Sequence, residues 1–272
     1  MKLLIAADME GISGVVHTSH VRSENSDYER FRSLMTADVN AAIEGAILGG
    51  AQEIVVTDGH WNGLNILIEE LDARARLNAG LASPYAMLEG LQNSVNAAFF
   101  IGYHARMGAL SGVLDHTWAS AKVENLWLNG RLAGETALNG AVCGHYGVPV
   151  LMVSGDQTLA AEASGWMRGI ETAIVKRATS RLSAECLPLE TSRQLIRTTA
   201  ERAVQRFLRR EAPQPLEIKT PITVGVEFIT SAMADSVETF PGLRRLDGRR
   251  VEVVTPNMPA AYFSFRSLVA MA

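Results

Sequence analysis

The sequence is poor in cysteine and has no long hydrophobic segment. Its two cysteines, Cys143 and Cys186, form neither a CxxC motif nor a disulfide framework. This usage fits a reducing compartment, so we expect the protein to be cytoplasmic. The apolar run 3–7 is interrupted by Asp8 before it reaches the length of a signal-peptide hydrophobic region. No later run is long enough to span a bilayer, and we therefore predict no membrane association.

An excess of charge of one sign is also missing. The 25 lysines and arginines nearly balance the 29 aspartates and glutamates, which gives a formal net charge of -4. No basic cluster is dense enough to contact a phosphate backbone, so we do not expect nucleic acid as a partner. The most basic stretch, 197–210, mixes arginines with apolar residues at helical spacing, which indicates a solvated helix face.

The sequence does contain alternating apolar strands and helices. A 3.6-residue apolar stripe predicts a helix over 28–48 that stops at Gly49-Gly50, between strands at 3–7 and 53–57. Further along, we predict strands at 97–101, 150–154 and 172–175, helices at 83–91, 135–146 and 160–167, and a hairpin at 122–132 that turns at Asn129-Gly130. These elements predict an α/β fold in which residues 1–185 form a three-layer αβα main domain with a mostly parallel sheet.

Residues 186–272 are predicted to form a smaller C-terminal α/β domain. Its expected elements are a long amphipathic helix at 190–210, strands at 222–228 and 251–254, and a final apolar helix. This part of the sequence contains no comparable cluster of potential ligands. We therefore expect it to shape a substrate pocket or an oligomer contact.

Three predicted strands of the main domain end in side chains that bind metals. Strand 3–7 leads into Asp8 and Glu10, strand 53–57 into Asp58 and His60, and strand 97–101 into His104. Neighbouring parallel strands lie about 5 Å apart, and their carboxyl ends meet in one crevice. This recurrence predicts a metal site at that edge of the sheet.

The residue types narrow the kind of metal. Asp8 and Glu10 project from the same face of an extended chain, although an acidic pair alone is equally typical of a solvated loop or a helix cap. His60 and His104 favour a metal site, because imidazole is a preferred ligand of Zn, Co, Ni and Fe, whereas carboxylate-only sites suit Mg and Ca. Asp58 either orients His60 or caps the next element.

The strand pattern alone does not decide whether two further residues, Glu135 and His116, belong to the site. Glu135 stands at the start of a predicted helix, where a carboxylate complements the helix dipole without any other role. His116 lies in a glycine-containing loop after strand 97–101. Such a loop histidine is either solvated or placed over the same crevice.

The order of several motifs resembles the DppA-type zinc D-aminopeptidases, peptidase family M55. The resemblance runs the whole length of the chain and rests on Asp8-Met9-Glu10-Gly11-Ile12-Ser13-Gly14, Asp58-Gly59-His60, Glu89-Gly90-Leu91, Gly102-Tyr103-His104-Ala105, His116, Gly134-Glu135 and Leu138-Asn139. A member of that family has serine where this chain has Gly59, a difference that keeps the histidine ligand but removes a hydroxyl.

The resemblance implies a dinuclear zinc aminopeptidase that hydrolyses short peptides with an N-terminal D-amino acid of the D-alanine type. Asp8 would bridge two zinc ions, their ligand shells would be completed by Glu10, His60, His104 and Glu135, and His116 would be the catalytic histidine. Metal-activated water would attack the peptide bond, with His116 stabilising the oxyanion or passing a proton to the departing amine. The resemblance also implies a homo-oligomer, a decameric ring of two stacked pentamers.

Two other functions are compatible with parts of the pattern. Asp8-Met9-Glu10-Gly11 is similar to the acidic start of haloacid dehalogenase-type, Mg-dependent phosphatases. Those enzymes need a later lysine and a paired acidic motif, however, where this chain offers His60, His104 and a solitary Asp156. A non-catalytic metal- or ligand-binding protein can also use an α/β crevice, since a fold does not guarantee activity. The number of convergent ligands favours the peptidase.

Overall fold

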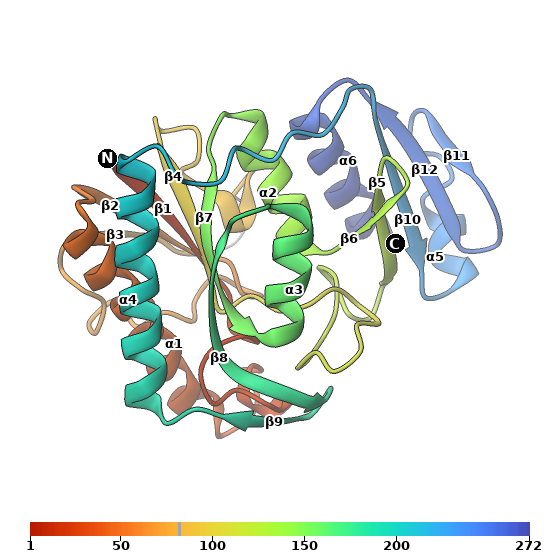
Figure 1. Ribbon diagram of the computed structural model, residues 1–272. Helices are drawn as coiled ribbons and strands as arrows, with labels where there is room; N and C mark the ends of the chain where they lie inside the picture. Colours follow the sequence, from red (N-terminus) through yellow and green to blue (C-terminus); the bar gives the residue numbers. More distant parts are fainter. Residues whose placement is uncertain (81–82) are drawn as a thin grey trace.

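A computed structural model of the protein describes residues 1–80 and 83–272 and contains two β-sheets of different size (Figure 1). The larger sheet consists of β1 (Lys2–Ala7), β2 (Glu53–Asp58), β3 (Ala75–Asn78), β4 (Ala97–Ile101), β7 (Val150–Asp156), β8 (Glu171–Ser180) and β9 (Ser183–Cys186). Its strand order is β3-β2-β1-β4-β7-β8-β9, and its pairs are parallel except for β8 with β9. The predicted α/β class with a mostly parallel sheet is confirmed.

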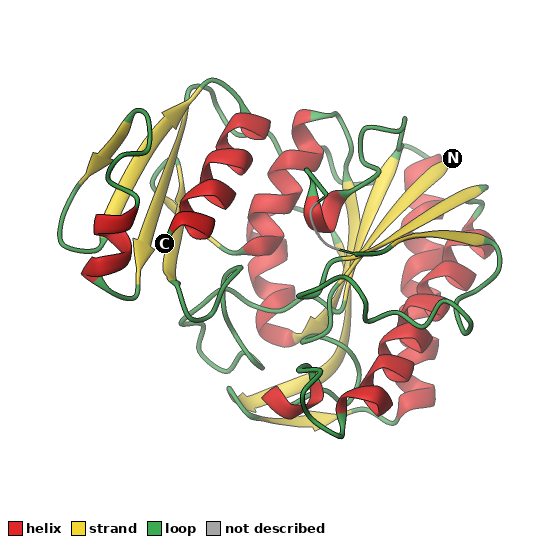
Figure 2. Cartoon of the chain, turned by 180° about the vertical axis from the view of Figure 1, so that it is seen from behind, coloured by secondary structure: helices red, strands yellow, loops and turns green. Residues whose placement is uncertain are grey.

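Helices cover both faces of the larger sheet (Figures 1 and 2). One face carries α1 (Tyr28–Gly49) and α4 (Leu189–Leu208), and the other carries α2 (Glu135–His145) and α3 (Gln157–Trp166). Side chains alternate along β1, so that Leu3 and Ile5 join the buried cluster of α1 and α4, whereas Leu4 and Ala6 join that of α2 and α3. This is the predicted three-layer αβα arrangement.

α1 and α4 approach each other closely because α1 carries glycines at their contact. A Cβ atom at Gly45 would lie 2.1 Å from the carbonyl oxygen of Arg197, and one at Gly49 would lie 2.7 Å from that of Glu201. α1 ends where the sequence predicted. Gly50 caps it with a φ of 110°, in the left-handed region that glycine adopts without a steric penalty.

The smaller sheet is antiparallel and joins distant parts of the chain. Its strands are β5 (Val123–Leu128), β6 (Arg131–Ala133), β10 (Ile222–Phe228), β11 (Leu243–Arg245) and β12 (Arg250–Thr255), in the order β11-β12-β10-β5-β6. The hairpin β5–β6, which the sequence predicted at 122–132, pairs with β10 through β5. α5 (Ser231–Ser236) follows β10, and α6 (Met258–Met271) follows β12.

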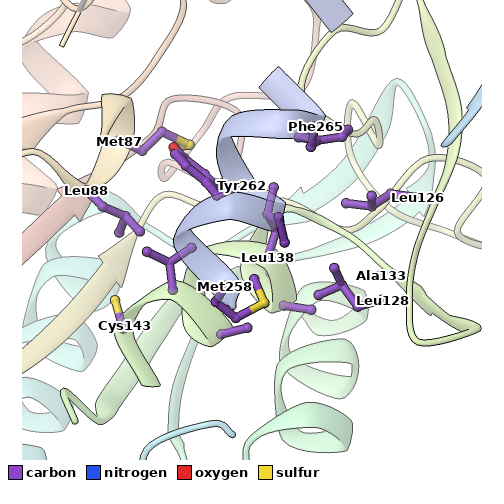
Figure 3. Close-up of a cluster of buried hydrophobic side chains, with 14 of the residues drawn as sticks. Met87, Leu88, Leu126, Leu128, Ala133, Leu138, Cys143, Met258, Tyr262 and Phe265 are labelled. Carbon is purple, nitrogen blue, oxygen red and sulfur yellow. The ribbon is translucent and has the colours of Figure 1, made fainter. Parts of the chain in front are cut away.

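α6 connects the smaller sheet to the main domain through a buried apolar cluster (Figure 3). Met258, Tyr262 and Phe265 of α6 belong to the same cluster as Leu126 of β5 and Leu138 of α2. The final apolar helix predicted from the sequence is therefore a core helix between the two sheets. It also forms part of the wall of the site described below.

The segment 83–91 differs from the prediction of a helix. It forms turns and a single 3-10 helix, η2 (Ala86–Leu88); a second one, η1 (Thr18–His20), precedes α1. The carboxylate of Glu89 accepts hydrogen bonds from the Ser83 hydroxyl and the Tyr85 backbone N–H, and Gly90 has a φ of 90°. Local side-chain bonds and a left-handed glycine thus replace the helical hydrogen bonds.

The boundary between the two predicted domains, at residue 185, stays a prediction. Two elements pack against the part of the structure on the other side of this boundary. α4 follows the boundary but packs against α1 of the main domain, and the hairpin β5–β6 precedes it but belongs to the smaller sheet. Residues before and after position 185 therefore contribute both to the smaller sheet and to the helix layers of the larger sheet.

Candidate metal centre

The carboxyl ends of β1, β2 and β4 meet at one edge of the larger sheet. β1 lies between the other two strands, with Ala7 opposite Asp58 of β2 and Ile101 of β4. The residues that follow these strands are thereby brought together, as the sequence predicted. They are Asp8, Glu10, His60 and His104, and all four are buried.

Asp8 lies at the middle of this cluster and directs its two carboxylate oxygens to different sides. Oδ1 is 3.2 Å from Nδ1 of His60, which is itself 3.1 Å from Oε2 of Glu10. Oδ2 is 3.3 Å from Nε2 of His104, which is 3.3 Å from Oε1 of Glu135. The cluster therefore consists of two groups that share Asp8, one with Glu10 and His60 and the other with His104 and Glu135.

Glu135 and His116 reach the cluster from outside the strand ends. Glu135 is the first residue of α2, and its Oε1 accepts a 2.7 Å hydrogen bond from the backbone N–H of Trp118. The His116 ring stacks on the His104 ring with centroids 3.9 Å apart, and its Nε2 lies 3.7 Å from Oε1 of Glu135. Potential ligand atoms of His104, His116 and Glu135 lie within 4.8 Å of one another, as do those of Asp8, Glu10 and His104.

Each of the three histidines is oriented by a backbone carbonyl. In each ring, one nitrogen faces the carboxylates of the cluster (the inner nitrogen) and the other faces away from them (the outer nitrogen). The outer nitrogen donates a hydrogen bond to a carbonyl oxygen: Nε2 of His60 to Val21 (2.9 Å), Nδ1 of His104 to Ala105 (3.0 Å) and Nδ1 of His116 to Leu114 (2.9 Å). Because a carbonyl only accepts, the outer nitrogen carries a ring proton. In the neutral ring, the inner nitrogen then presents a lone pair to the carboxylates, as in a metal-binding histidine.

The charges of the cluster raise the pKa values of His60 and His104 and lower the pKa of Asp8. Burial alone would lower the pKa of His60 and His104, but the charges of Glu10 and Glu135 raise both pKa values well above the usual one. Burial alone would raise the pKa of Asp8, yet its contacts with the two histidines lower it well below the usual range. Protonated imidazoles thus balance the carboxylates, and a metal ion can take the place of their protons.

The loop that carries Asp8 and Glu10 is fixed by a buried lysine that the sequence analysis missed. Nζ of Lys176, on β8, donates hydrogen bonds to the carbonyl oxygens of Glu10 (2.5 Å), Ile12 (2.9 Å) and Val15 (2.6 Å). Burial lowers the pKa of this ammonium to about 8. The sequence gives little signal for this role, because Lys176 stands in a strand that also contains the charged residues Glu171 and Arg177.

Asp58 supports the cluster indirectly. Its carboxylate accepts hydrogen bonds from the backbone N–H groups of Asn65 (2.6 Å) and Ile66 (2.8 Å) and from the side-chain amide of Asn65 (2.8 Å). The same amide donates to the carbonyl oxygen of His60 (2.6 Å). Asp58 therefore holds the backbone of His60 through Asn65, which the sequence analysis did not single out.

A cavity of about 590 Å³ opens over the cluster. Asp8, Glu10, His60, His116 and Glu135 line it together with Trp118, Lys122 and Arg266. His116 has 16% of its side chain exposed, more than any of the other cluster histidines or carboxylates. The volume is that of a site for a small molecule or a short peptide.

Comparison with known proteins establishes the family. A family model described as D-aminopeptidase, peptidase family M55, matches residues 1–267. The chain belongs to this family. A D-aminopeptidase of Bacillus subtilis (strain 168) is 35% identical over 274 residues, a match that covers 100% of this chain and 98% of the relative.

A solved structure supports the same assignment. It is described as the Zn-dependent D-aminopeptidase DppA from Bacillus subtilis, a self-compartmentalizing protease. It matches with a TM-score of 0.95 and 33% identity, over 100% of this chain and 97% of that chain. The resemblance inferred from the motifs is thus confirmed, and the chain is a member of a peptidase family rather than a haloacid dehalogenase-type phosphatase.

Proposed function

We propose that this protein is a zinc D-aminopeptidase that holds two zinc ions per chain through Asp8, Glu10, His60, His104 and Glu135. The proposal is carried by the division of the buried cluster into two groups that share Asp8. Each group offers one oxygen of Asp8, one further carboxylate and one imidazole. Three protein ligands leave a zinc coordination position open for water or substrate. The name of the structural relative, which includes "Zn-dependent", supports the choice of metal.

The residues of the cluster fit zinc in two further respects. Oε2 of Glu10 is buried and forms no hydrogen bond within residues 1–80 and 83–272, although it lies 3.1 Å from Nδ1 of His60. A cation would satisfy this oxygen. The backbone carbonyls that hold His60 and His104 also fix the inner ring nitrogens toward the carboxylates, which is how outer hydrogen bonds orient the histidine ligands of zinc.

His116 is assigned the movement of a proton during hydrolysis. Zinc bound at the cluster would supply a water of lowered pKa, about 7, and polarise the scissile carbonyl. The His116 ring is held by stacking on His104 and by the bond from Nδ1 to Leu114, so Nε2 faces the cavity beside Glu135. From this position His116 can pass a proton to the departing amine or stabilise the oxyanion. An acyl-histidine trapped during turnover would contradict this role.

The substrates are proposed to be short peptides with an N-terminal D-residue such as D-alanine. The cavity has room for a few residues but not for a folded chain. With zinc bound the carboxylates are occupied as ligands, so a free N-terminal amine would bind in its neutral form at a coordination position that three protein ligands leave open. The D configuration is supported by the names of the relatives, which are D-aminopeptidases.

A homo-oligomer in the form of a decameric ring is also proposed. The structural relative is described as self-compartmentalizing, which requires several subunits. One loop of this chain exposes Trp61, Leu64 and Ile68, of which 59%, 57% and 69% are accessible. Subunit contacts would cover such apolar side chains.

A cytoplasmic location is proposed from the cysteine usage. Both cysteines are free, Cys143 in the core and Cys186 at the surface. Separately, no helix in the described parts of the chain is long and apolar enough to cross a membrane.

Metal analysis combined with hydrolysis of D-alanyl-D-alanine and L-alanyl-L-alanine tests the proposal. We expect two zinc ions per chain and cleavage of the D-peptide in the wild type, and loss of one ion and of cleavage in His104→Ala. His145→Ala, an exposed histidine at the end of α2, serves as the matched control and should keep both. An unchanged zinc content and cleavage rate in His104→Ala would contradict the proposed site. Zinc binding without cleavage of either peptide would favour a non-catalytic metal-binding protein.

A further inference from the structure

Two cations on the wall of the cavity, Lys122 and Arg266, donate hydrogen bonds to backbone carbonyls. Lys122, which precedes β5, and Arg266, on α6, line the same cavity as Asp8, Glu10 and Glu135. Within residues 1–80 and 83–272, neither cation forms a salt bridge with a carboxylate, and their hydrogen bonds go to backbone carbonyls. Positive charge that is not balanced by a carboxylate is suited to an anionic ligand.

Both head groups are held in place but keep hydrogen-bond donors for a ligand. Nζ of Lys122 donates to the carbonyl oxygen of Val269 at 2.9 Å, and an ammonium has three donors. Nη1 of Arg266 donates to the carbonyl oxygens of Ser83, at 3.3 Å, and Pro84, and a guanidinium has five donors. Pre-positioned donors lose little side-chain freedom when they bind a carboxylate.

Trp118 contacts both the carboxylate cluster and Arg266. Its backbone N–H donates to Glu135, and the Arg266 guanidinium lies 5.7 Å from the centre of its ring. The same guanidinium lies 5.6 Å from the ring centre of Tyr262. These cation–π contacts fix the orientation of Arg266 beside the segment that contacts the cluster. Lys122 and Arg266 thus line the same cavity as the carboxylate cluster.

We propose that Lys122 and Arg266 bind the C-terminal carboxylate of the peptide substrate. This inference rests on the proposed peptidase function and narrows its substrates to short peptides with a free C-terminus. A short peptide with free ends matches the cavity, with its amino end at the zinc-binding cluster and its carboxylate toward the two cations. Arginine binds carboxylates through two parallel N–H donors, so Arg266 is the more specific of the two contacts.

Kinetics with two peptides that differ only in the carboxylate test the inference. The substrates are D-alanyl-D-alanine and D-alanyl-D-alaninamide, and the zinc-loaded variants are Lys122→Met and Arg266→Met. We expect the wild type to prefer the free acid, and each variant to reduce that preference about tenfold through a higher KM for the acid. Arg22→Met is the matched control, because Arg22 lines the same cavity but lies 3.9 Å from the carboxylate of Glu24. It should leave the ratio unchanged.

The outcomes separate this inference from the proposed function. If both variants cleave both peptides with the wild-type ratio, or lose the two activities in equal measure, the cations only tether the cavity wall and the inference is wrong. If the zinc-loaded wild type cleaves neither peptide, the proposed function is contradicted instead. In that case, the equilibrium affinities of the wild type and of Arg266→Met for the acid and the amide test the inference without turnover. Preference for the acid that disappears in Arg266→Met supports it, and equal binding of acid and amide overturns it.

Discussion

Replacement of Lys176 by methionine should loosen the loop that carries Asp8 and Glu10. The side chain is 1% exposed, and its ammonium donates to three carbonyl oxygens of that loop. Methionine has a similar length but no donor, so the three carbonyls would stay buried without a partner. Glu10 would then be held less firmly, and its group of ligands should bind zinc more weakly than the group of His104.

The expected loss in the free energy of unfolding is the difference between two opposing contributions, the hydrogen bonds of the ammonium and the cost of its burial. A hydrogen bond from a charged donor contributes about 1.5–3 kcal/mol, so three contribute roughly 5–9 kcal/mol. Burial opposes this, since a fall in the pKa of Lys176 from 10.5 to about 8 corresponds to roughly 3 kcal/mol against the charged form. The hydrogen bonds contribute more than burial costs, and we expect Lys176→Met to lower the free energy of unfolding by about 2–6 kcal/mol.

Urea unfolding of the zinc-free protein measures this loss, and metal analysis after dialysis measures zinc retention. The matched control is Arg177→Met, which changes the neighbouring residue of β8 on its exposed side. Between pH 8 and 10.5 the unfolded chain binds more protons at Lys176 than the folded one, so wild-type stability relative to Lys176→Met should rise with pH in that window. A variant with wild-type stability and both zinc ions would refute the reasoning.

Three further predictions concern the cluster itself. His60→Ala should lose one of the two zinc ions, as measured by metal analysis, and retention of both would count against the shared-carboxylate arrangement. Because the pKa values of His60 and His104 are raised in the zinc-free protein, zinc uptake near pH 7 should release protons, seen in a pH-stat, and weaken as the pH falls; uptake without proton release would contradict this. Gly11→Ala would place a Cβ atom 1.8 Å from the carbonyl oxygen of Tyr103, so Tm and zinc content should both fall, whereas Gly248→Ala, in open space, should change neither.

The sequence predicts the part of the site that comes from a regular pattern. Asp8, Glu10, His60 and His104 follow strands that the apolar runs locate, and parallel neighbours necessarily end at the same edge. Glu135 and His116 do not follow from that pattern. One begins a helix, where a carboxylate has an independent electrostatic reason to occur, and the other lies in a loop whose course no local rule determines. Only the family resemblance identified these two.

Contacts between distant segments account for what the sequence could not predict. The role of Lys176 depends on backbone carbonyls of another segment, which have no side-chain signature. The pairing of β5 with β10 and the packing of α4 on α1 likewise depend on tertiary contacts between elements far apart in the chain. Local periodicity specifies each element but not its neighbour.

Titration of the metal-free protein with zinc, with the cleavage of D-alanyl-D-alanine followed at each step, tests the central claim most directly. The two groups that share Asp8 predict that activity rises until two zinc ions are bound per chain and then stays constant. Full activity without zinc, or no activity once two ions are bound, would contradict the account.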